Sequence, residues 1–556
     1  MIDEIDFSKK YEYSVDIRHD KLGEFGKGSL SFGENNRVRL GFKNHFQSNL
    51  LSDGKMYQGF KAFCDDGKCF TLFNCKYWGF HIYAEFIITD EVTNSFKQIH
   101  IRYSDVSDWF FQWQQIEGTI GEALTWKNKA KDINVNIITP QEQFSLTSAS
   151  VTSFSKSGED QTIHEHVSFI FERANGKYTF DDTRTKALEL STLLSILIAQ
   201  PLSIVSMEVV TEDDKFHCAY FPSYKKSARN SPSSEFSHIC FTPKAILDDR
   251  WQSIFESYYK SKLTKKLWPR LSGMQRYDGF WEFKILGYVS LLDRFVSLHA
   301  KQTELETTKV PDEKKIKFNE ILNQISPTLT TDQSKGIMDG VASIFSERIS
   351  FQEQYKHAVN GTDNDIVKII EISDEDFKLI KKVRDGAAHG TSPDLKDADS
   401  ERIHAIVDKI ALLLTYWAFK DFGLTSQDFI KCLNFTHNHL RWGSMLNSVH
   451  LDRASGAKFF TISKEQFDKI SNINPSIGPI IFTQEKLNGI EYSEELSEKI
   501  KKWRLDNLGF SGQIPMDEIF NVNKEQIEYL GNAYYQYEEG STKPLKIPFG
   551  YVIKEI

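Results

Sequence analysis

Short runs of alternating hydrophobic and polar residues fill the chain from its N-terminus to about residue 220. Segments such as RVRLGF, QIHIRY and HVSFIFE are rich in β-branched and aromatic residues, and turn sequences such as GENN, DDGK and ANGK separate them. Many short strands with this punctuation predict a sandwich or barrel-like β domain. One helix is expected within the region, roughly over residues 183–199, and Pro201 should end it.

From about residue 245 to about residue 430 the apolar positions recur every three or four residues instead. The segment WEFKILGYVSLLDRFVSLHA, for example, places its apolar side chains in one broad stripe along a helix. Further helices are expected over residues 251–262, 314–325, 374–389 and 400–422. This pattern predicts a helical bundle with a core of its own.

The change of period divides the chain into four parts. We expect a β-rich domain over residues 1–223, a linker over 224–244, a helical domain over 245–430 and a mixed α/β segment of unknown role over 431–556. The linker is suggested by the Ser-rich, basic stretch YKKSARNSPSSEFSH. The expected fold class is therefore α+β and multidomain, with a β-rich N-terminal domain, an all-α bundle and a small mixed C-terminal segment.

Composition narrows the class of protein further. Of the 556 residues, 40% are hydrophobic and 26% are charged, which is ordinary for a globular chain and excludes long disorder as its main state. No apolar run is long enough to span a membrane, and the acidic N-terminus MIDEIDFSKKY does not resemble a signal peptide. We expect a cytoplasmic protein. The net charge of −9 disfavours a general nucleic-acid coat but leaves room for a local basic patch.

The six cysteines predict neither a disulfide scaffold nor a zinc ribbon, because they are few and no C-x-x-C pair occurs. Three of them lie close together in AFCDDGKCFTLFNC. They could supply two metal ligands, but small buried side chains of strands are the favoured interpretation. We therefore predict no metal site and no cofactor.

The most informative segment is ISDEDFKLIKKVRDGAAHGTSPD. Ser373 and Asp376 have the spacing of a helix-capping pair, and a helix starting there would end near Gly390. Its C-terminal end carries Arg384, Asp385 and His389. Phe377, Ile380 and Val383 recur every three residues and are expected to face the core.

Arginine, aspartate and histidine at this spacing suit phosphodiester chemistry. Arg384 offers a planar, permanently charged fork for phosphate oxygens, and His389 can take up and return a proton near neutral pH. Asp385 precedes His389 by four residues, so its carboxylate can orient the imidazole on one helix face. From these residues alone, ordinary surface charges at a helix end remain the alternative.

The context of the motif adds a family resemblance. RDGAAHG, followed by the long apolar helix IHAIVDKIALLLTYWAF, resembles the signature of the HEPN superfamily, and YQGFKAFCDDGKCFTLFNC is similar to a pattern of the ApeA N-terminal domain. The order of the two segments resembles the ApeA-like family of bacterial anti-phage proteins. Asp385 departs from the family pattern, in which asparagine is frequent at this position.

The resemblance implies a metal-independent endoribonuclease that acts in anti-phage defence by abortive infection. His389 would be the general base or acid for attack by the RNA 2′-OH, Arg384 would stabilise the phosphoryl charge, and Asp385 would hold the imidazole. It also implies a homodimer through the helical domain and a β-rich domain that senses a phage-derived trigger or restrains the nuclease. The alternative is a non-catalytic HEPN module that binds RNA or a protein partner.

A second candidate is a basic cluster in KSKLTKKLWPR. Lys262, Lys265, Lys266 and Arg270 lie close to Trp268 and could follow an RNA backbone. An ordinary solvated helix end would have the same composition, so both interpretations stay open. The glycine-rich phosphate loops of nucleotide enzymes are absent from the sequence.

Overall fold

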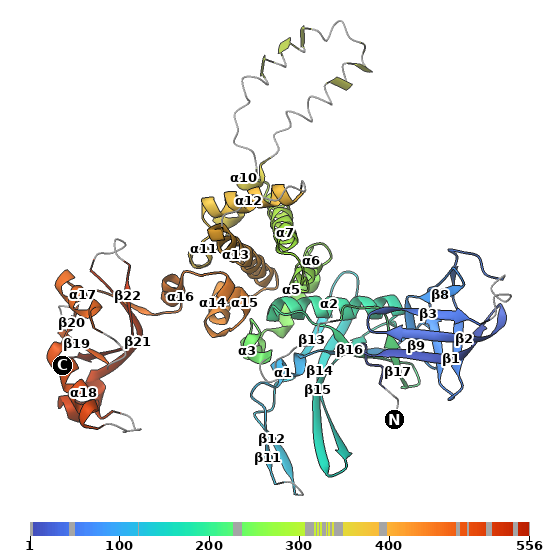
Figure 1. Ribbon diagram of the computed structural model, residues 1–556, viewed down its shortest axis with the longest axis horizontal. Helices are drawn as coiled ribbons and strands as arrows, with labels where there is room; N and C mark the ends of the chain where they lie inside the picture. The colour runs from blue at the N-terminus through green and yellow to red at the C-terminus, as the bar shows by residue number, and fades with distance from the viewer. Residues whose placement is uncertain are drawn as a thin grey trace. The chain divides into compact units, whose positions relative to one another are not determined.

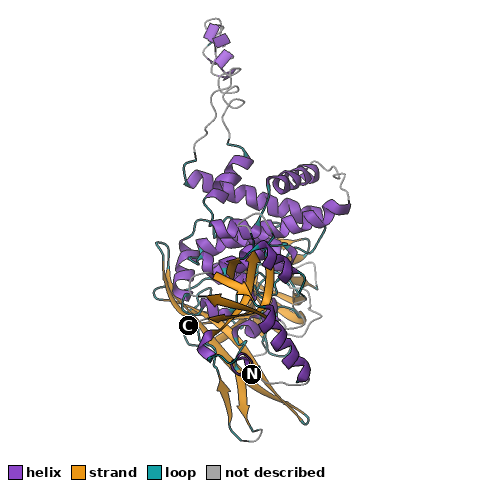
Figure 2. Cartoon of the chain, turned by 90° about the vertical axis from the view of Figure 1, so that its left-hand side faces the viewer, coloured by secondary structure: helices purple, strands orange, loops and turns teal. Residues whose placement is uncertain are grey.

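The computed structural model confirms an α+β chain with a β-rich N-terminal part, a helical middle part and a small mixed C-terminal part (Figure 1, Figure 2). It describes residues 4–43, 50–119, 122–225, 236–305, 349–388, 397–473, 479–485, 489–507, 514–537 and 543–554, with a few positions between 316 and 337. The predicted helix over residues 314–325 lies for the most part outside these described residues.

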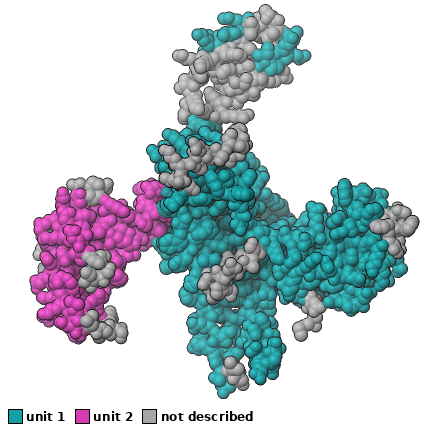
Figure 3. All heavy atoms as spheres, in the orientation of Figure 1, with its two compact units in different colours: residues 1–363, 372–445 teal, residues 364–371, 446–556 magenta. Residues whose placement is uncertain are grey.

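The chain forms two compact units. One contains residues 1–363 and 372–445, and the other contains residues 364–371 and 446–556 (Figure 3). The domain boundaries at residues 223, 244 and 430 stay predictions. Within the predicted linker, however, the stretch from Phe236 is packed into the first unit, because Phe236 and Phe241 are fully buried and Phe241 contacts Phe419 and Phe429.

The N-terminal strands pair into one sheet of fifteen strands in the order β13-β14-β15-β10-β16-β17-β9-β6-β5-β1-β2-β3-β8-β7-β4. Every pairing in it is antiparallel. The strands are β1 (Lys10–His19), β2 (Gly23–Gly33), β3 (Asn36–Phe42), β4 (Met56–Tyr57), β5 (Phe60–Cys64), β6 (Cys69–Phe73), β7 (Cys75–Trp78), β8 (His81–Ala84), β9 (Phe86–Thr89), β10 (Gln98–Tyr103), β13 (Asn134–Ile138), β14 (Gln143–Ser157), β15 (Asp160–Arg173), β16 (Ile204–Val210) and β17 (Phe216–Tyr220). Residues alternate between the two faces as the sequence predicted; in β10, Ile99, Ile101 and Tyr103 are buried.

Helix α2 (Phe180–Ile198) is the long helix of this part, and it begins three residues before the predicted start. The earlier start follows from a capping box, in which the side chain of Thr179 accepts from the backbone of Asp182 and the Asp182 carboxylate accepts from the backbone of Thr179. The short helix α1 (Val106–Phe110) lies in the same part, and α3 (Phe236–Ile239) and α4 (Lys244–Leu247) lie where the chain passes into the helical part.

Two hairpins project side by side from the β-rich part in both views (Figure 1, Figure 2). One is formed by β11 (Gln115–Gly118) and β12 (Leu124–Lys127), and the other by the outer halves of β14 and β15. Trp126 Nε1 donates a hydrogen bond of 2.5 Å to Glu165 Oε1 and so connects them.

The helical part confirms the predicted change of period. Its helices are α5 (Trp251–Lys260), α6 (Trp268–Gln275), α7 (Trp281–Gln302), α10 (Phe351–Asn360), α12 (Asp374–Ala388), α13 (Asp397–Asp421), α14 (Ser426–Phe435) and α15 (His439–Gly443). The two longest, α7 and α13, bury apolar stripes that include Val289, Leu292 and Leu414.

Polar contacts join the β-rich and helical parts within the first unit. Tyr258 of α5 donates to the backbone carbonyl of Glu189 in α2 at 2.9 Å, and Trp109 Nε1 donates to the carbonyl of Thr242 at 2.7 Å. Within the helical part, Arg250, the residue before α5, forms an ion pair with the buried Asp428 of α14. The helical part is therefore packed directly against the β-rich part, because hydrogen bonds across the contact satisfy buried donors on both sides.

The second unit is built on a five-stranded mixed sheet in the order β18-β21-β22-β19-β20. Its elements are α11 (Asn364–Ile370), α16 (Ser448–Ala454), β18 (Lys458–Thr461), α17 (Lys464–Ser471), β19 (Ile480–Glu485), β20 (Gly489–Tyr492), α18 (Glu494–Asp506), α19 (Met516–Phe520), β21 (Ile527–Gln536) and β22 (Leu545–Lys554). Phe482 and Tyr535 stack at 4.5 Å on one face, whereas Ile481 and Ile500 pack on the other. The expected mixed α/β character of the C-terminal segment is confirmed, since it contains short helices and a terminal strand.

Candidate active site

Helix α12 begins at the cap that the sequence predicted. The Ser373 and Asp376 backbone N–H groups each donate to the other residue's side chain, at 3.1 Å. Arg402 of α13 adds a hydrogen bond of 2.8 Å from Nε to Asp376 Oδ1. Burial alone would raise the pKa of Asp376, but the hydrogen bonds from Ser373 and Arg402 outweigh burial and lower the pKa. The cap thus fixes the start of α12 and ties it to α13.

The apolar face of α12 is buried as predicted. Phe377, Ile380 and Val383 are at most 2% exposed. The Phe377 ring packs between two aromatic residues of α10, with centroid distances of 4.5 Å to Tyr355 and 5.0 Å to Phe351. Because this face is fixed by burial, the residues that follow Val383 are placed at the rim of the bundle.

Arg384 and Asp385 form a close ion pair at this rim. Arg384 donates from Nε at 2.9 Å and from Nη2 at 2.6 Å, and both bonds go to Asp385 Oδ1. The Arg384 side chain is 23% exposed and that of Asp385 is 47% exposed. The guanidinium carbon also lies 5.6 Å from the centre of the Phe351 ring, a cation–π distance.

This arrangement positions the guanidinium and leaves some of its N–H donors available. An arginine has five N–H donors, and Asp385 takes two of them among the described residues. The remaining donors suit the oxygens of a phosphate group. His389, the predicted general base, lies outside the described residues, as do Gly390 and the residues up to 396. The structure therefore brings together two of the three predicted catalytic residues.

The predicted basic cluster lies in the turn between α5 and α6 and at the start of α6. Lys262, Lys265, Lys266 and Arg270 are all exposed, and none of them forms an ion pair with the described residues. The neighbouring Trp268 is fully buried, and its Nε1 donates to Asp421 at 2.6 Å. The cluster therefore presents charge to solvent, whereas its tryptophan belongs to the core and is not available for stacking.

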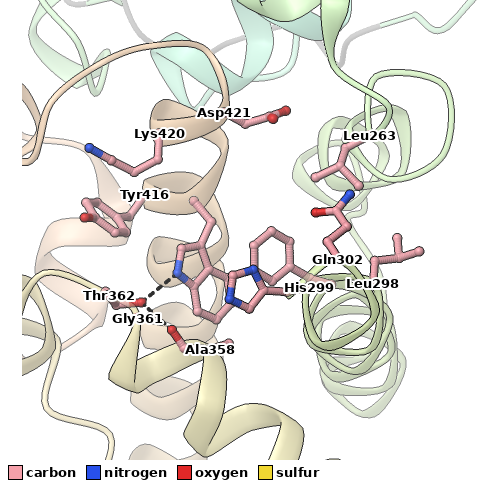
Figure 4. A pocket seen from close by; sticks show the side chains of 12 residues that line it. Leu263, Leu298, His299, Gln302, Ala358, Gly361, Thr362, Tyr416, Lys420 and Asp421 are labelled. Atoms are coloured by element: carbon pink, nitrogen blue, oxygen red, sulfur yellow. Dashed lines mark hydrogen bonds between the residues drawn. The ribbon is translucent and has the colours of Figure 1, made fainter. Parts of the chain in front are cut away.

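The structure also contains a cavity that sequence reasoning missed. It has a volume of about 310 Å³ and lies between α7, α13 and the turn after α10 (Figure 4). Phe295 and Trp417 stack in its wall with centroids 4.2 Å apart, and Trp417 Nε1 donates to Thr362 Oγ1 at 2.9 Å. The i, i+4 spacing of Phe295 and His299 was the available signal, but it is also the spacing of an ordinary apolar stripe.

Two titratable groups of the cavity have shifted pKa values. Burial, helped by the charge of His357, lowers the pKa of His299. Burial raises the pKa of Asp421, although hydrogen bonds from Ser261 and Trp268 oppose the shift. Titratable groups with shifted pKa values in a cavity are a feature of functional sites. Here, however, the burial of His299 and Asp421 around the stacked rings of Phe295 and Trp417 explains both pKa shifts.

Comparison with family models places the helical domain that carries Arg384 and Asp385 in the HEPN class. Residues 286–428 match the model described as Apea-like HEPN. Residues 20–258 match ApeA N-terminal domain 1. The chain therefore has the ApeA-like architecture, with the N-terminal domain first and the HEPN domain second. No curated protein and no solved structure matches it.

The match to the ApeA-like HEPN family supports the assignment of this chain as an anti-phage effector of that family. HEPN domains are generally nucleases. Among the described residues, no helix has the length and apolarity needed to cross a membrane. The same part of the chain contains no group of three histidine, cysteine or acidic side chains arranged to hold a metal ion. The matched ranges leave residues 429–556 without a family.

Proposed function

We propose that this protein is a cytoplasmic anti-phage effector whose HEPN domain cleaves RNA without a metal ion. The observation that supports it most is the position of Arg384. A carboxylate and an aromatic ring hold its guanidinium at the rim of an ApeA-like HEPN domain, and donors remain for a phosphate. Positioned charge of this kind stabilises a transition state better than a freely moving side chain does.

In the proposed reaction the RNA 2′-OH attacks the adjacent phosphorus. His389 removes the 2′ proton, the bond from phosphorus to the 5′ oxygen breaks, and the protonated imidazole returns the proton to that oxygen. Arg384 donates to the non-bridging oxygens as their negative charge grows. Asp385 orients the imidazole of His389. The products are a 2′,3′-cyclic phosphate and a 5′-hydroxyl end, and DNA resists because it lacks the nucleophile.

Asp385 has a second effect in this scheme. Its negative charge lies beside the site of the phosphate, where it opposes binding of the substrate. The two hydrogen bonds from Arg384 offset part of that charge and keep the carboxylate aligned. The exposed cations Lys262, Lys265 and Lys266, together with Arg270, would hold the RNA backbone further from the reacting phosphate.

The proposal includes a homodimer formed through the HEPN domain, which would bring two Arg384–His389 motifs into one cleft. It also gives the N-terminal domain the task of sensing a phage-derived trigger or restraining the nuclease. The hydrogen bonds from Tyr258 to Glu189 and from Trp109 to Thr242 support a mechanical connection, because they link the β-rich part directly to the helices.

The alternative is a HEPN module that binds RNA or a protein without cleaving it. One observation favours it: the Arg384–Asp385 pair by itself is also an ordinary surface ion pair. The two functions differ in one measurement, the rate at which purified protein cleaves a labelled RNA.

The decisive experiment compares initial cleavage rates of the parent with those of His389→Ala and Arg384→Lys. Loss of a proton-transfer group lowers the rate by about 10²–10⁴-fold. Arg384→Lys should also fail, because an ammonium group cannot reproduce the planar fork. Lys382→Ala is the matched control, since it removes an exposed cation from the same helix. If His389→Ala cleaves like the parent, the nuclease assignment is wrong.

A further inference from the structure

The outer face of three strands at one end of the N-terminal sheet combines aromatic rings with cations. Strands β3, β8 and β7 are neighbours, and their inner residues, such as Val38, Ile82 and Cys75, are buried. Apart from Arg37, the outer residues fall into two rows set by the strand register, because directly opposed residues project from the same face. We refer to the face formed by Arg37, Arg39, Lys76, Trp78, His81 and Tyr83 as the β3–β8–β7 face.

The first row places a ring between two cations. Arg39 is opposite Tyr83, and Tyr83 is in turn opposite Lys76. Arg39 and Lys76 are exposed, and Tyr83 is half-buried. Met56 of β4 continues the row beyond Lys76 and is 48% exposed. The row therefore crosses four strands without an acidic residue.

The second row is aromatic. His81 lies opposite Gly41 on one side and Trp78 on the other, and the Trp78 side chain is 62% exposed. Gly41 leaves space beside the imidazole, because a Cβ atom there would lie only 3.2 Å from His81 Nδ1. A tryptophan left this open gains little from burial in the chain itself, so its exposure points to a partner.

The turn that joins β7 to β8 adds a strained aromatic residue. Gly79 and Phe80 have φ values of 52° and 69°, which is the left-handed pair that a two-residue hairpin turn requires. Glycine or asparagine is preferred at such positions, and a phenylalanine there costs free energy. Burial of the ring offsets only part of this conformational free energy, because Phe80 remains 54% exposed. Strain held at an exposed aromatic tip is typical of a binding element.

The described residues do not neutralise the cations of the face. Arg37, Arg39 and Lys76 form no ion pair with the described residues, and Glu85, the acid that follows β8, lies 3.7 Å from Arg184 of α2 instead. Arg39 Nη2 lies 2.5 Å from His81 Nε2. Burial and the charge of Arg39 lower the pKa of His81, so the ring is neutral at pH 7 and accepts this bond without offsetting the charge.

We propose that the β3–β8–β7 face binds single-stranded nucleic acid, with Trp78 and Phe80 stacking on bases and Arg37, Arg39 and Lys76 contacting phosphates. Stacking platforms with interleaved cations bind single strands with little regard for sequence. A duplex fits poorly, because its bases are already stacked on one another. The site is separate from Arg384, so it goes beyond the nuclease proposed above and does not depend on it.

The test measures binding to the full-length protein by fluorescence anisotropy. The probes are a labelled 2′-O-methyl oligouridylate of about 12 nucleotides and an oligothymidylate of the same length, matched to the usual site size of such surfaces. Neither probe has a free 2′-OH, so binding is read even if the nuclease is active, and a failure of the nuclease proposal leaves this result untouched. Either probe can serve, since both carry bases and phosphates.

Two variants separate stacking from charge. Trp78→Ala should weaken binding about 5- to 160-fold, the range for loss of one stacked base. Arg39→Gln combined with Lys76→Gln should make the slope of log affinity against log salt shallower by about 1.4, or about 0.7 for each phosphate that is no longer neutralised. Trp113→Ala and the double variant Lys129→Gln with Lys156→Gln are the matched controls, because Trp113 is 70% exposed and both lysines are exposed in the same domain without an ion pair to the described residues.

The expected pattern is weaker binding in the two face variants with unchanged melting temperature, and parental binding in both controls. The proposal is overturned if the parent does not bind either probe at micromolar concentration, or if the face variants bind within twofold of the parent. Equal weakening in the controls, or a duplex of the same length that binds as tightly as the single strand, would overturn it as well.

Discussion

Replacing Asp385 with asparagine tests the proposed geometry of the active site most directly. The asparagine side chain keeps an oxygen where Asp385 Oδ1 accepts from Arg384 at 2.9 Å and 2.6 Å, but it removes the negative charge. The pair is partly exposed, and exposed ion pairs contribute about 0.2–1 kcal/mol. The free energy of unfolding should therefore fall by less than about 1 kcal/mol, and the melting temperature by only a few degrees.

The effect on substrate binding has the opposite sign. A phosphate bound to Arg384 would lie roughly 6 Å from the Asp385 carboxylate, where two negative charges repel by about 0.7 kcal/mol in water and about 3 kcal/mol at an effective dielectric of 20. Because Asp385 is half exposed, the lower part of that range applies. KM should therefore decrease by about three- to tenfold, since 1.4 kcal/mol corresponds to a factor of ten. The kcat should also fall, because a neutral amide orients an imidazolium less well than a carboxylate does.

The assay is steady-state cleavage of one labelled RNA, with melting temperatures measured on the same preparations. Glu375→Gln is the control, because it removes the same charge from the first turn of the same helix, where the Glu375 side chain is 81% exposed. A rise in KM would contradict the reasoning, because it would show that Asp385 assists substrate binding through Arg384. A loss of kcat as large as that of His389→Ala would show that Asp385 does more than orient the imidazole.

Three further outcomes are expected. Cleavage should persist in EDTA, because the proposed reaction uses only the 2′-OH, an imidazole and a guanidinium; activity that disappears in EDTA and returns with Mg²⁺ would contradict this. The active protein should be a dimer by light scattering at micromolar concentration, and a fully active monomer would refute the paired-motif proposal. Asp376→Asn should lower the melting temperature at pH 7 through a loss of about 1–2 kcal/mol, since the Asp376 carboxylate accepts from the Ser373 backbone at the start of α12 and from Arg402. The folded state lowers the pKa of Asp376, so its stabilisation is present above the unfolded pKa of about 3.9 and is lost as the pH falls through the folded value. The difference in melting temperature between parent and variant should therefore shrink below about pH 4. A difference that stays constant with pH would be inconsistent with this cause.

Local pattern was sufficient for α12. The Ser373–Asp376 pair predicted its start, and the three-residue spacing of Phe377, Ile380 and Val383 predicted its buried face. Both features depend on residues within a few turns of one another, so they can be read without knowledge of the rest of the fold. In α2 the start was predicted three residues late, because the cap at Thr179 lies in a stretch with no apolar period.

The residues that lie close to Arg384 in space but far from it in the sequence could not be predicted from local pattern. Phe351 precedes Arg384 by 33 residues, and only the packing of α10 on α12 brings its ring to 5.6 Å from the guanidinium. Trp268 illustrates the reverse case. Beside four cations in the sequence it suggested a stacking residue, whereas in the fold it is fully buried and donates to Asp421, which follows it by 153 residues.

The sequence by itself determined the order of β-rich, helical and mixed parts, the capped helix that carries Arg384 and Asp385, and the family to which its domains are similar. These properties depend on hydrophobic period and short motifs, which are local. Only the tertiary structure decided which side chains meet across elements. Cross-strand register placed Arg39, Tyr83 and Lys76 in one row, because pairing sets which residues oppose each other and alternation sets the face from which they project.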